Sequence, residues 1–349
     1  MARKRVESRP RRATMVNVAE AAGVSQSTVS FVINDRRDVV VAEETRQRVL
    51  QAAADLGYRP NRVAQSLRLN QSFLVGIVTR GIVGGPYAGR IISGIQQVVQ
   101  ANDQLCMVVD ATDDPSQGDP AVANLLAQGV TGIIYAGFIP AETHTSPDLG
   151  QTRCVFVNCW PADRSIATGV ILADDYGGGR KAAEAAFAAG HTDVAFLGGI
   201  ETEFACIERH RGFLDAAAAA GIDPAGLFQT YGNYEISGGY DATLEAFRQG
   251  RPTALVCGND RMAVGAILAL HTLGLEVPRD VSVIGYDDQP DMADEVRPRL
   301  TTVALPHYEM GQQAGRLLLG LEDADGRRDF TIDSPLVERD SLAPPPTVT

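Results

Sequence analysis

The chain has 349 residues, of which 45% are hydrophobic and 21% are charged. This composition is that of a globular protein and excludes a largely disordered chain, and the length predicts about two or three domains. No run of about 18 apolar residues occurs, and the basic N-terminus is not followed by the apolar segment of a signal peptide, so we expect a cytoplasmic protein without a membrane span. The odd number of cysteines without a CxxC pair predicts buried thiols, not disulfides or zinc: Cys106, Cys154, Cys159, Cys206 and Cys257.

Charge is distributed unevenly along the chain. Residues 1–70 contain 13 Lys and Arg against 7 Asp and Glu, a net charge of +6, whereas residues 71–349 contain the remaining 18 against 36, a net charge of -18. Only a basic segment can neutralise phosphates, so this asymmetry indicates a polyanion-binding head on an acidic body. A basic tail without a partner is the alternative. We expect residues 1–13 to be disordered.

Residues 14–60 have the pattern of three short helices. Thr14 is suited to cap the first helix, and Gly23 is suited to end it, because glycine adopts the left-handed conformation of a tight turn. Ser25 is suited to cap a second helix. A third helix with Val49 on its inner face ends at Gly57. Two helices joined by a short turn, followed by a third, form the helix-turn-helix layout.

From Phe73 onward, apolar strands alternate with amphipathic helices. This rhythm predicts parallel sheets with helices on both faces, and the length favours two doubly wound lobes that bind ligands beyond the carboxyl ends of their strands. We expect strands at 74–78, 105–109, 132–135, 155–157, 194–197, 254–257 and 281–284, and helices at 87–101, 122–128, 179–189, 212–220 and 263–273.

Several motifs together point to one family. Residues 18–34 read VAEAAGVSQSTVSFVIN, and their second helix opens with small polar side chains that can approach base edges without a steric penalty. The text continues with LGYRPNRVAQSL at 56–67, RHRGF at 209–213, TALVCGND at 253–260, VIGYDD at 283–288 and the pairs Gly190-His191 and Thr301-Thr302. Over almost its whole length the sequence resembles the LacI/GalR family of transcriptional regulators.

The resemblance implies an all-α helix-turn-helix head and a two-lobed α/β body similar to periplasmic binding proteins. It implies a head at 14–60, a hinge helix and linker at 61–71 and a body at 72–343, whose N-lobe covers about 72–174 and 302–331 and whose C-lobe covers about 175–299 and 332–343. The implied partners are double-stranded operator DNA and a second copy of the chain. The implied DNA-binding residues are Thr14, Ser25, Gln26, Ser27, Thr28, Ser30, Phe31, Asn34, Tyr58, Asn61, Arg62, Ala64 and Leu67.

Two positions depart from the family pattern. Phe31 stands where several members have Arg, so the base preference of that position does not transfer. Val41 stands where a capping Ser is common, which leaves the start of the third helix open.

The hinge is too short to be a stable helix by itself. Isolated helices need about 12–15 residues in water, and residues 61–67 provide fewer. A helix that forms only with support acts as a switch, and the resemblance implies that two hinges pair over DNA with Leu67 wedged into the minor groove. A plain linker with a stray Leu is the alternative.

The body offers polar and aromatic candidates for a small-molecule site. Asn259 and Asp287 directly follow apolar strands, and Arg209 can form a bidentate fork. The simpler alternatives are a helix cap for Asp174 and a core position for Tyr234. We expect a sugar, or else a nucleobase-like compound, with no cofactor and no metal, at Tyr87, Trp160, Asp174, Arg209, Tyr234, Asn259 and Asp287.

Two other classes of protein share this type of body. A solute-binding transport protein would have an export signal and no basic head. An enzyme acting on sugars would need a phosphate or dinucleotide loop, and neither a Walker A loop, GxGxxG after the first strand, GxSxG nor HExxH occurs. We therefore expect a repressor whose operator affinity is controlled by an effector, not an enzyme. No heptad-like tail follows Asp340, which favours a dimer over a tetramer.

Overall fold

The computed structural model describes residues 13–36, 38–59, 72–80, 88–111, 119–322, 326 and 328–346. The chain divides into two compact units, Met1–Ser72 and Phe73–Thr349, called the head and the body below. The expected hinge at 61–71 and all but the last residue of the expected N-terminal tail lie outside the described residues.

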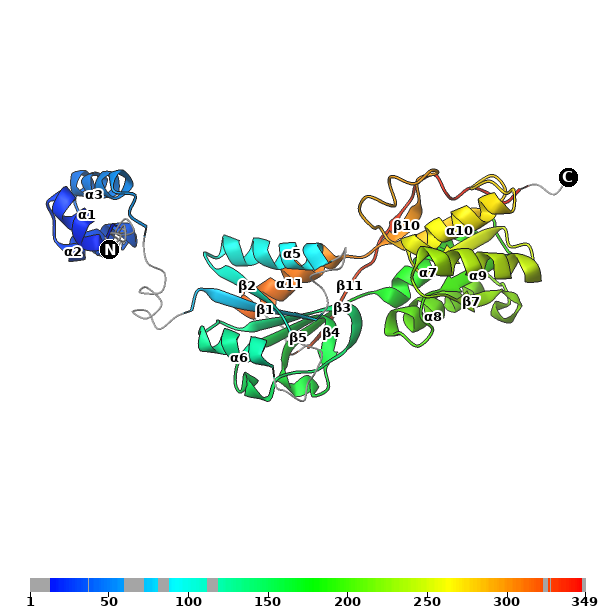
Figure 1. The fold of residues 1–349 in the computed structure, drawn as a ribbon, viewed down its shortest axis with the longest axis horizontal. Coiled ribbons are helices and arrows are strands. Elements are labelled where there is room, and N and C mark those ends of the chain that lie inside the picture. The colour runs from blue at the N-terminus through cyan, green and yellow to red at the C-terminus, as the bar shows by residue number, and fades with distance from the viewer. Residues whose placement is uncertain are drawn as a thin grey trace, which may run out of the picture. The chain divides into compact units, whose positions relative to one another are not determined.

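The head consists of α1 (Met15–Ala22), α2 (Gln26–Ile33) and α3 (Glu43–Asp55) (Figure 1). Its helices pack around a small apolar core that includes Val18, Val29, Val32 and Val49. The helices therefore form the predicted helix-turn-helix layout, with Val49 on the inner face of the third helix as expected.

The predicted caps of the first two helices are confirmed. The Thr14 side chain accepts a hydrogen bond from the Asn17 amide, Gly23 has a φ of 66°, and the Ser25 side chain accepts from the Thr28 amide. The third helix begins without a side-chain cap, because its N-cap position is Ala42. Glu43 and Glu44 in its first turn instead place negative charge at the positive end of the helix dipole.

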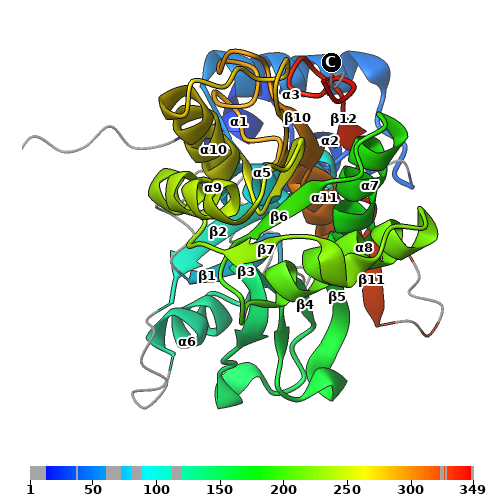
Figure 2. The same cartoon turned by 90° about the vertical axis from the view of Figure 1, so that its right-hand side faces the viewer.

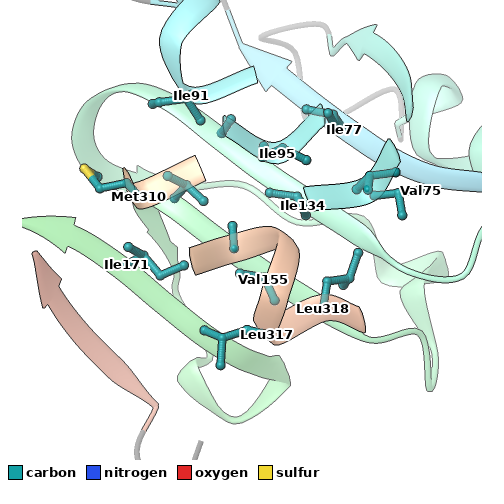
Figure 3. Packing of buried hydrophobic residues seen from close by; sticks show 14 of the residues in the cluster. Val75, Ile77, Ile91, Ile95, Ile134, Val155, Ile171, Met310, Leu317 and Leu318 are labelled. Carbon is teal, nitrogen blue, oxygen red and sulfur yellow. The ribbon is translucent and has the colours of Figure 1, made fainter. Parts of the chain in front are cut away.

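The first lobe of the body is a six-stranded sheet in the order β11-β5-β4-β3-β1-β2, and all its strand pairs are parallel. One face is covered by α5 and α11, whose apolar residues pack on the strands as Figure 3 shows. The helix α6 packs on the opposite face. The elements are β1 (Leu74–Arg80), α5 (Ala88–Ala101), β2 (Leu105–Asp110), α6 (Pro120–Ala127), β3 (Ile133–Thr143), β4 (Cys154–Pro161), β5 (Ala167–Ala173), α11 (His307–Leu319) and β11 (Asp329–Ile332).

The second lobe is a six-stranded sheet in the order β12-β10-β9-β8-β6-β7, in which only the pair β10–β12 is antiparallel. Figure 2 shows α7 and α8 on one side of this sheet and α9 and α10 on the other. The elements are α7 (Asp175–Ala188), β6 (Val194–Gly198), α8 (Phe204–Ala219), β7 (Gln229–Tyr231), α9 (Ile236–Gln249), β8 (Ala254–Cys257), α10 (Asp260–Thr272), β9 (Ser282–Asp287), β10 (Thr301–Ala304) and β12 (Leu336–Val337). Within the described residues, short 3₁₀ helices occupy Pro147–Leu149 and Arg164–Ile166 in the first lobe and Pro224–Gly226 in the second lobe.

Two helices, α9 and α11, were not expected from the sequence rhythm. Both contain glycines, which lower helix propensity but allow close packing. A Cβ atom on Gly239 of α9 would lie 2.1 Å from the Met262 carbonyl oxygen, and one on Gly311 of α11 would lie 2.2 Å from the Ile91 carbonyl oxygen. The formation of these two helices therefore depends on tertiary packing and not on local helix propensity.

The chain passes between the two lobes after β5, after β10 and after β11. The lobe boundary expected near residue 302 is wrong, because Thr301–Ala304 pairs with β9 and belongs to the second sheet. Its strand character is hidden in the sequence by its short length. The crossing lies at Leu305, which packs against the apolar clusters of both lobes.

We predict that Gly94→Ala destabilises the body, because the new Cβ atom would lie 2.1 Å from the Tyr308 carbonyl oxygen and push α5 away from α11. Overpacking of this kind costs about 1–3 kcal/mol of unfolding free energy. Gly89→Ala in the same helix is the matched control, since no heavy atom lies within 4 Å of its added Cβ. Urea denaturation measures both variants, and equal stability of the two would contradict this packing.

Candidate functional site

A cavity of about 110 Å³ lies between the two lobes of the body. Apolar residues of β3 and the crossing residue Leu305 form part of its wall, and polar side chains converge on it mainly from the second lobe. Its lining consists of Phe138, Ile139, Pro140, Asn158, Asp175, Glu203, Ala205, Arg209, Tyr234, Asn259, Asp287, Leu305 and His307. A cavity with apolar walls and a few convergent polar groups is typical of a small-molecule site.

Arg209 is the central charged group of the cavity. Its Nε donates to Asp175 Oδ1 at 2.8 Å, and its Nη1 donates to the Gly258 carbonyl oxygen at 2.7 Å and lies 3.8 Å from Asp287 Oδ1. Its Cζ also lies 3.6 Å from the centroid of the Tyr286 ring. Although burial opposes its charge, the Asp175 carboxylate keeps the pKa of Arg209 well above its ordinary value. A guanidinium fixed in this way presents its remaining donors in one orientation.

The Asn259 side chain forms one hydrogen bond with the first turn of α10 and one with the backbone of Tyr234. Asn259 Oδ1 caps α10 by accepting from the Met262 amide at 2.9 Å, while its Nδ2 donates to the Tyr234 carbonyl oxygen at 3.0 Å. Tyr234 has a φ of 62°, and its ring occupies the space that a side chain on Gly199 would need. The Tyr234 hydroxyl is buried, without a hydrogen-bond partner in the part of the chain that the structure describes.

Asp287 ends β9 in a left-handed conformation, with a φ of 109°. The neighbouring loop is fixed by the buried Asp260, whose carboxylate accepts from the Gln289 amide at 2.7 Å and from the Thr302 hydroxyl at 2.6 Å. Burial, and then the charge of Asp287, raise the pKa of Asp260 well above its ordinary value. Asp287 is 6% exposed, so its carboxylate belongs to the cavity and not to the surface.

The structure brings together four of the residues that the sequence singled out for effector binding: Arg209, Tyr234, Asn259 and Asp287. Asp174 instead caps α7 by accepting from the Gly177 amide at 2.8 Å. The ring of Trp160 does not line the cavity and contacts Phe204, with 5.2 Å between ring centroids. Tyr87 lies outside the described residues.

Four polar residues of the cavity were missed from the sequence: Asn158, Asp175, Glu203 and His307. A signal for Asp175 existed, because a helix-capping Asp directs its carboxylate to the backbone and leaves the next Asp available for another partner. Asn158 carries no such signal. It has a φ of 55°, and its amide donates to the carbonyl oxygens of Gly137 and Phe138.

In the head, α2 presents its polar side chains unequally. Gln26 and Ser27 are exposed, whereas Thr28, Ser30 and Phe31 are partly buried. The Asn34 amide donates to the Ser30 carbonyl oxygen at 2.6 Å and to the Ser30 hydroxyl at 3.2 Å.

The remaining residues that were predicted to bind DNA are not part of α2. Thr14 and Ser25 cap helices, and Tyr58 packs against the head core. Four more lie outside the described residues: Asn61, Arg62, Ala64 and Leu67.

The described residues contain no cluster of three His, Cys, Asp or Glu side chains that could hold a metal ion. Among those same residues, no helix has both the length and the apolar composition needed to cross a bilayer.

A helix-turn-helix unit joined to a two-lobed body with a polar cavity defines the class of ligand-responsive DNA-binding regulators. The model of bacterial regulatory proteins of the lacI family matches residues 14–61, and that of the periplasmic binding protein-like domain matches residues 183–342. The HTH-type transcriptional repressor PurR of Erwinia tasmaniensis is 33% identical over 338 residues, which cover 96% of this chain and 98% of that protein. PurR of Pectobacterium carotovorum is also 33% identical, over 339 residues and the same shares of the two chains.

Solved structures give the same result. The lac repressor dimer bound to operator and the anti-inducer ONPF has a TM-score of 0.74 at 29% identity, covering 95% of this chain and 100% of that one. The transcriptional regulator CelR in complex with cellobiose has a TM-score of 0.61 at 25% identity, with the same coverage. The chain belongs to the lacI family of bacterial regulatory proteins, and it is a transcriptional repressor controlled by a small molecule, not an enzyme.

We predict that His307 makes the body sensitive to acid. Burial, helped by the charges of Arg90 and Arg209, lowers the pKa of this imidazole from 6.5 to about 4. The unfolded chain therefore takes up a proton before the folded chain does, so stability is complete above the ordinary pKa and is lost as the pH falls toward about 4. The loss amounts to about 3 kcal/mol at most.

The measurement compares denaturation of the wild type, His307→Asn and the exposed control His271→Asn at neutral and acidic pH. His307→Asn should lose part of the acid sensitivity, while His271→Asn should retain it. An unchanged pH dependence in His307→Asn would show that its imidazole is not a buried neutral group.

Proposed function

We propose that the effector of this repressor is a sugar-like polyol held in the cavity between the lobes. The observation that carries the proposal is the convergence of Arg209, Tyr234, Asn259 and Asp287 on one cavity with an apolar wall. Guanidinium, amide, phenol and carboxylate groups suit the alternating donors and acceptors of hydroxyl groups. The apolar residues Ile139 and Leu305 suit the C–H face of a sugar ring.

The relatives support this class of ligand. CelR, at 25% identity, is solved in complex with cellobiose, and the lac repressor, at 28–29% identity, is solved with ONPF and with ONPG. A nucleobase-like ligand is the alternative that the same polar groups allow. A thermal-shift screen of sugars and nucleobases, repeated with operator DNA, tests the proposal. If nucleobases alone raise the melting temperature of the protein, the effector is a nucleobase-like compound and not a sugar.

The proposed mechanism couples the cavity to DNA through the position of the two lobes. A ligand that touches both lobes fixes their relative placement, and in a homodimer this placement sets the spacing of two hinges at 61–71 on operator DNA in the cytoplasm. Coupling is reciprocal, so operator DNA must change effector affinity by the same factor by which the effector changes operator affinity. In this proposal Leu67 is the wedge in the minor groove and the head at 14–60 reads a half-site.

We predict that Gln26→Ala weakens binding to the operator more than binding to random DNA. Gln26 is exposed at the start of α2, where its amide suits a bidentate pair of hydrogen bonds to a base edge, worth about 1–3 kcal/mol of discrimination. Gln51→Ala, which removes an exposed amide from α3, is the matched control. Fluorescence anisotropy with both DNAs measures the effect. Equal losses on operator and random DNA would remove Gln26 from the readout.

We predict that Asp287→Asn abolishes most of the effector response without changing operator affinity in the absence of effector. Loss of a charged partner to a ligand hydroxyl costs about 1.5–3 kcal/mol, or roughly 10–150-fold in effector affinity. The exposed Asp291→Asn in the same loop is the control. Each variant is first checked for an unchanged melting temperature and then titrated with effector on labelled operator. Half-release at the wild-type concentration would place the ligand elsewhere.

A further inference from the structure

The side chains that line the cavity carry more negative than positive charges. Three carboxylates line it, those of Asp175, Glu203 and Asp287, against one guanidinium, that of Arg209. A second cation, Arg90, acts on His307, whose imidazole is kept neutral. The cavity therefore favours ligands that are not anionic.

Two of the carboxylates form ion pairs with Arg209, whereas the third, that of Glu203, is influenced by the charge of Arg209 without forming an ion pair with it. Asp175 Oδ1 lies 2.8 Å and Asp287 Oδ1 3.8 Å from guanidinium nitrogens of Arg209. The carboxylate of Glu203 forms no hydrogen bond and no ion pair within the described residues, and it does not cap α8, although its backbone occupies the N-cap position. Partial burial raises the pKa of Glu203, and the charge of Arg209 opposes this rise.

A second polar group of the same lobe also lacks a partner. The Tyr234 hydroxyl is buried and lines the same cavity, and no described residue forms a hydrogen bond with it. Glu203 and Tyr234 line the same cavity. Burial raises the pKa of Tyr234, and the charge of Glu203 adds to this rise. A buried hydroxyl without a partner is costly, and a donor group supplied by a ligand satisfies both this hydroxyl and the half-buried carboxylate of Glu203.

We propose that the effector is a polyol that carries a protonated amine, which Glu203 and Tyr234 bind, while Arg209, Asn259 and Asp287 bind its hydroxyl groups. This inference rests on the proposed polyol site and adds its charge specificity. An ammonium group donates up to three hydrogen bonds and accepts none, so it matches a carboxylate beside a phenol oxygen. A phosphate ester of the same polyol, or a derivative with a free carboxylate, meets Glu203 as a like charge and is excluded.

The experiment uses matched probes on the full-length protein: glucosamine with glucose and glucose phosphate, and galactosamine with galactose and galactose phosphate. Isothermal titration and thermal shift at neutral pH measure binding to the wild type, to Glu203→Gln and to the control Glu201→Gln, an exposed neighbour outside the cavity lining. We expect at least one amine to bind about tenfold to a hundredfold more tightly than its parent sugar, as charge-assisted hydrogen bonds do. This preference should disappear in Glu203→Gln and persist in Glu201→Gln.

The outcomes separate this inference from the proposed function. Parent sugars that bind the wild type as tightly as the amines overturn the amine and leave the polyol site intact. A preference for amines that survives in Glu203→Gln overturns the role of Glu203. Tight binding of a phosphate, or no binding of any amine, overturns the charge specificity. Sugar binding that is unaffected by Asp287→Asn instead overturns the site itself.

Discussion

The second lobe depends on one constraint, the burial of the Arg209 guanidinium at 7% side-chain exposure. A buried charge is stable only when it is paired and hydrogen-bonded, so partners must reach it from several elements at once. They come from α7 with Asp175, from the end of β8 with the Gly258 carbonyl, and from β9 with Tyr286 and Asp287. The same requirement that holds these elements together also collects the polar groups of the cavity at one edge of the sheet.

A second constraint connects the cavity to the rest of the body. Leu305 lies where the chain crosses from β10 to α11, packs against the apolar clusters of both lobes and lines the cavity. Close helix packing surrounds this crossing, because Gly94 of α5 and Gly311 of α11 leave no space for a side chain between the two helices. A ligand in the cavity therefore touches a residue whose position both cores share, which is the physical basis for coupling ligand binding to the placement of the lobes.

Most of the positive charge of residues 1–70 lies before the folded helices of the head and not on them. Residues 1–12 carry six Lys and Arg against one Glu, so they contribute five of the six net positive charges of residues 1–70. The folded helices are nearly neutral, and in the described part Arg36 and Arg46 form ion pairs with Asp38 and Asp35. General attraction to DNA is thus expected mainly from the residues before α1, and discrimination between sequences from the exposed side chains of α2.

The sequence by itself determined the two-part organisation, the family, the first two helix caps and four residues of the cavity, because caps, glycine stops and strand-end polar residues are local signals. It did not determine α9 and α11, whose glycines are explained only by the helices packed on them. Nor did it separate Asp174 from Asp175, since one caps α7 and the other pairs with Arg209, thirty-four residues away along the chain. Only the tertiary structure shows that Glu203, Asn158 and His307 line the cavity. The chain crosses between the lobes three times, and these crossings bring together segments that are far apart in the sequence.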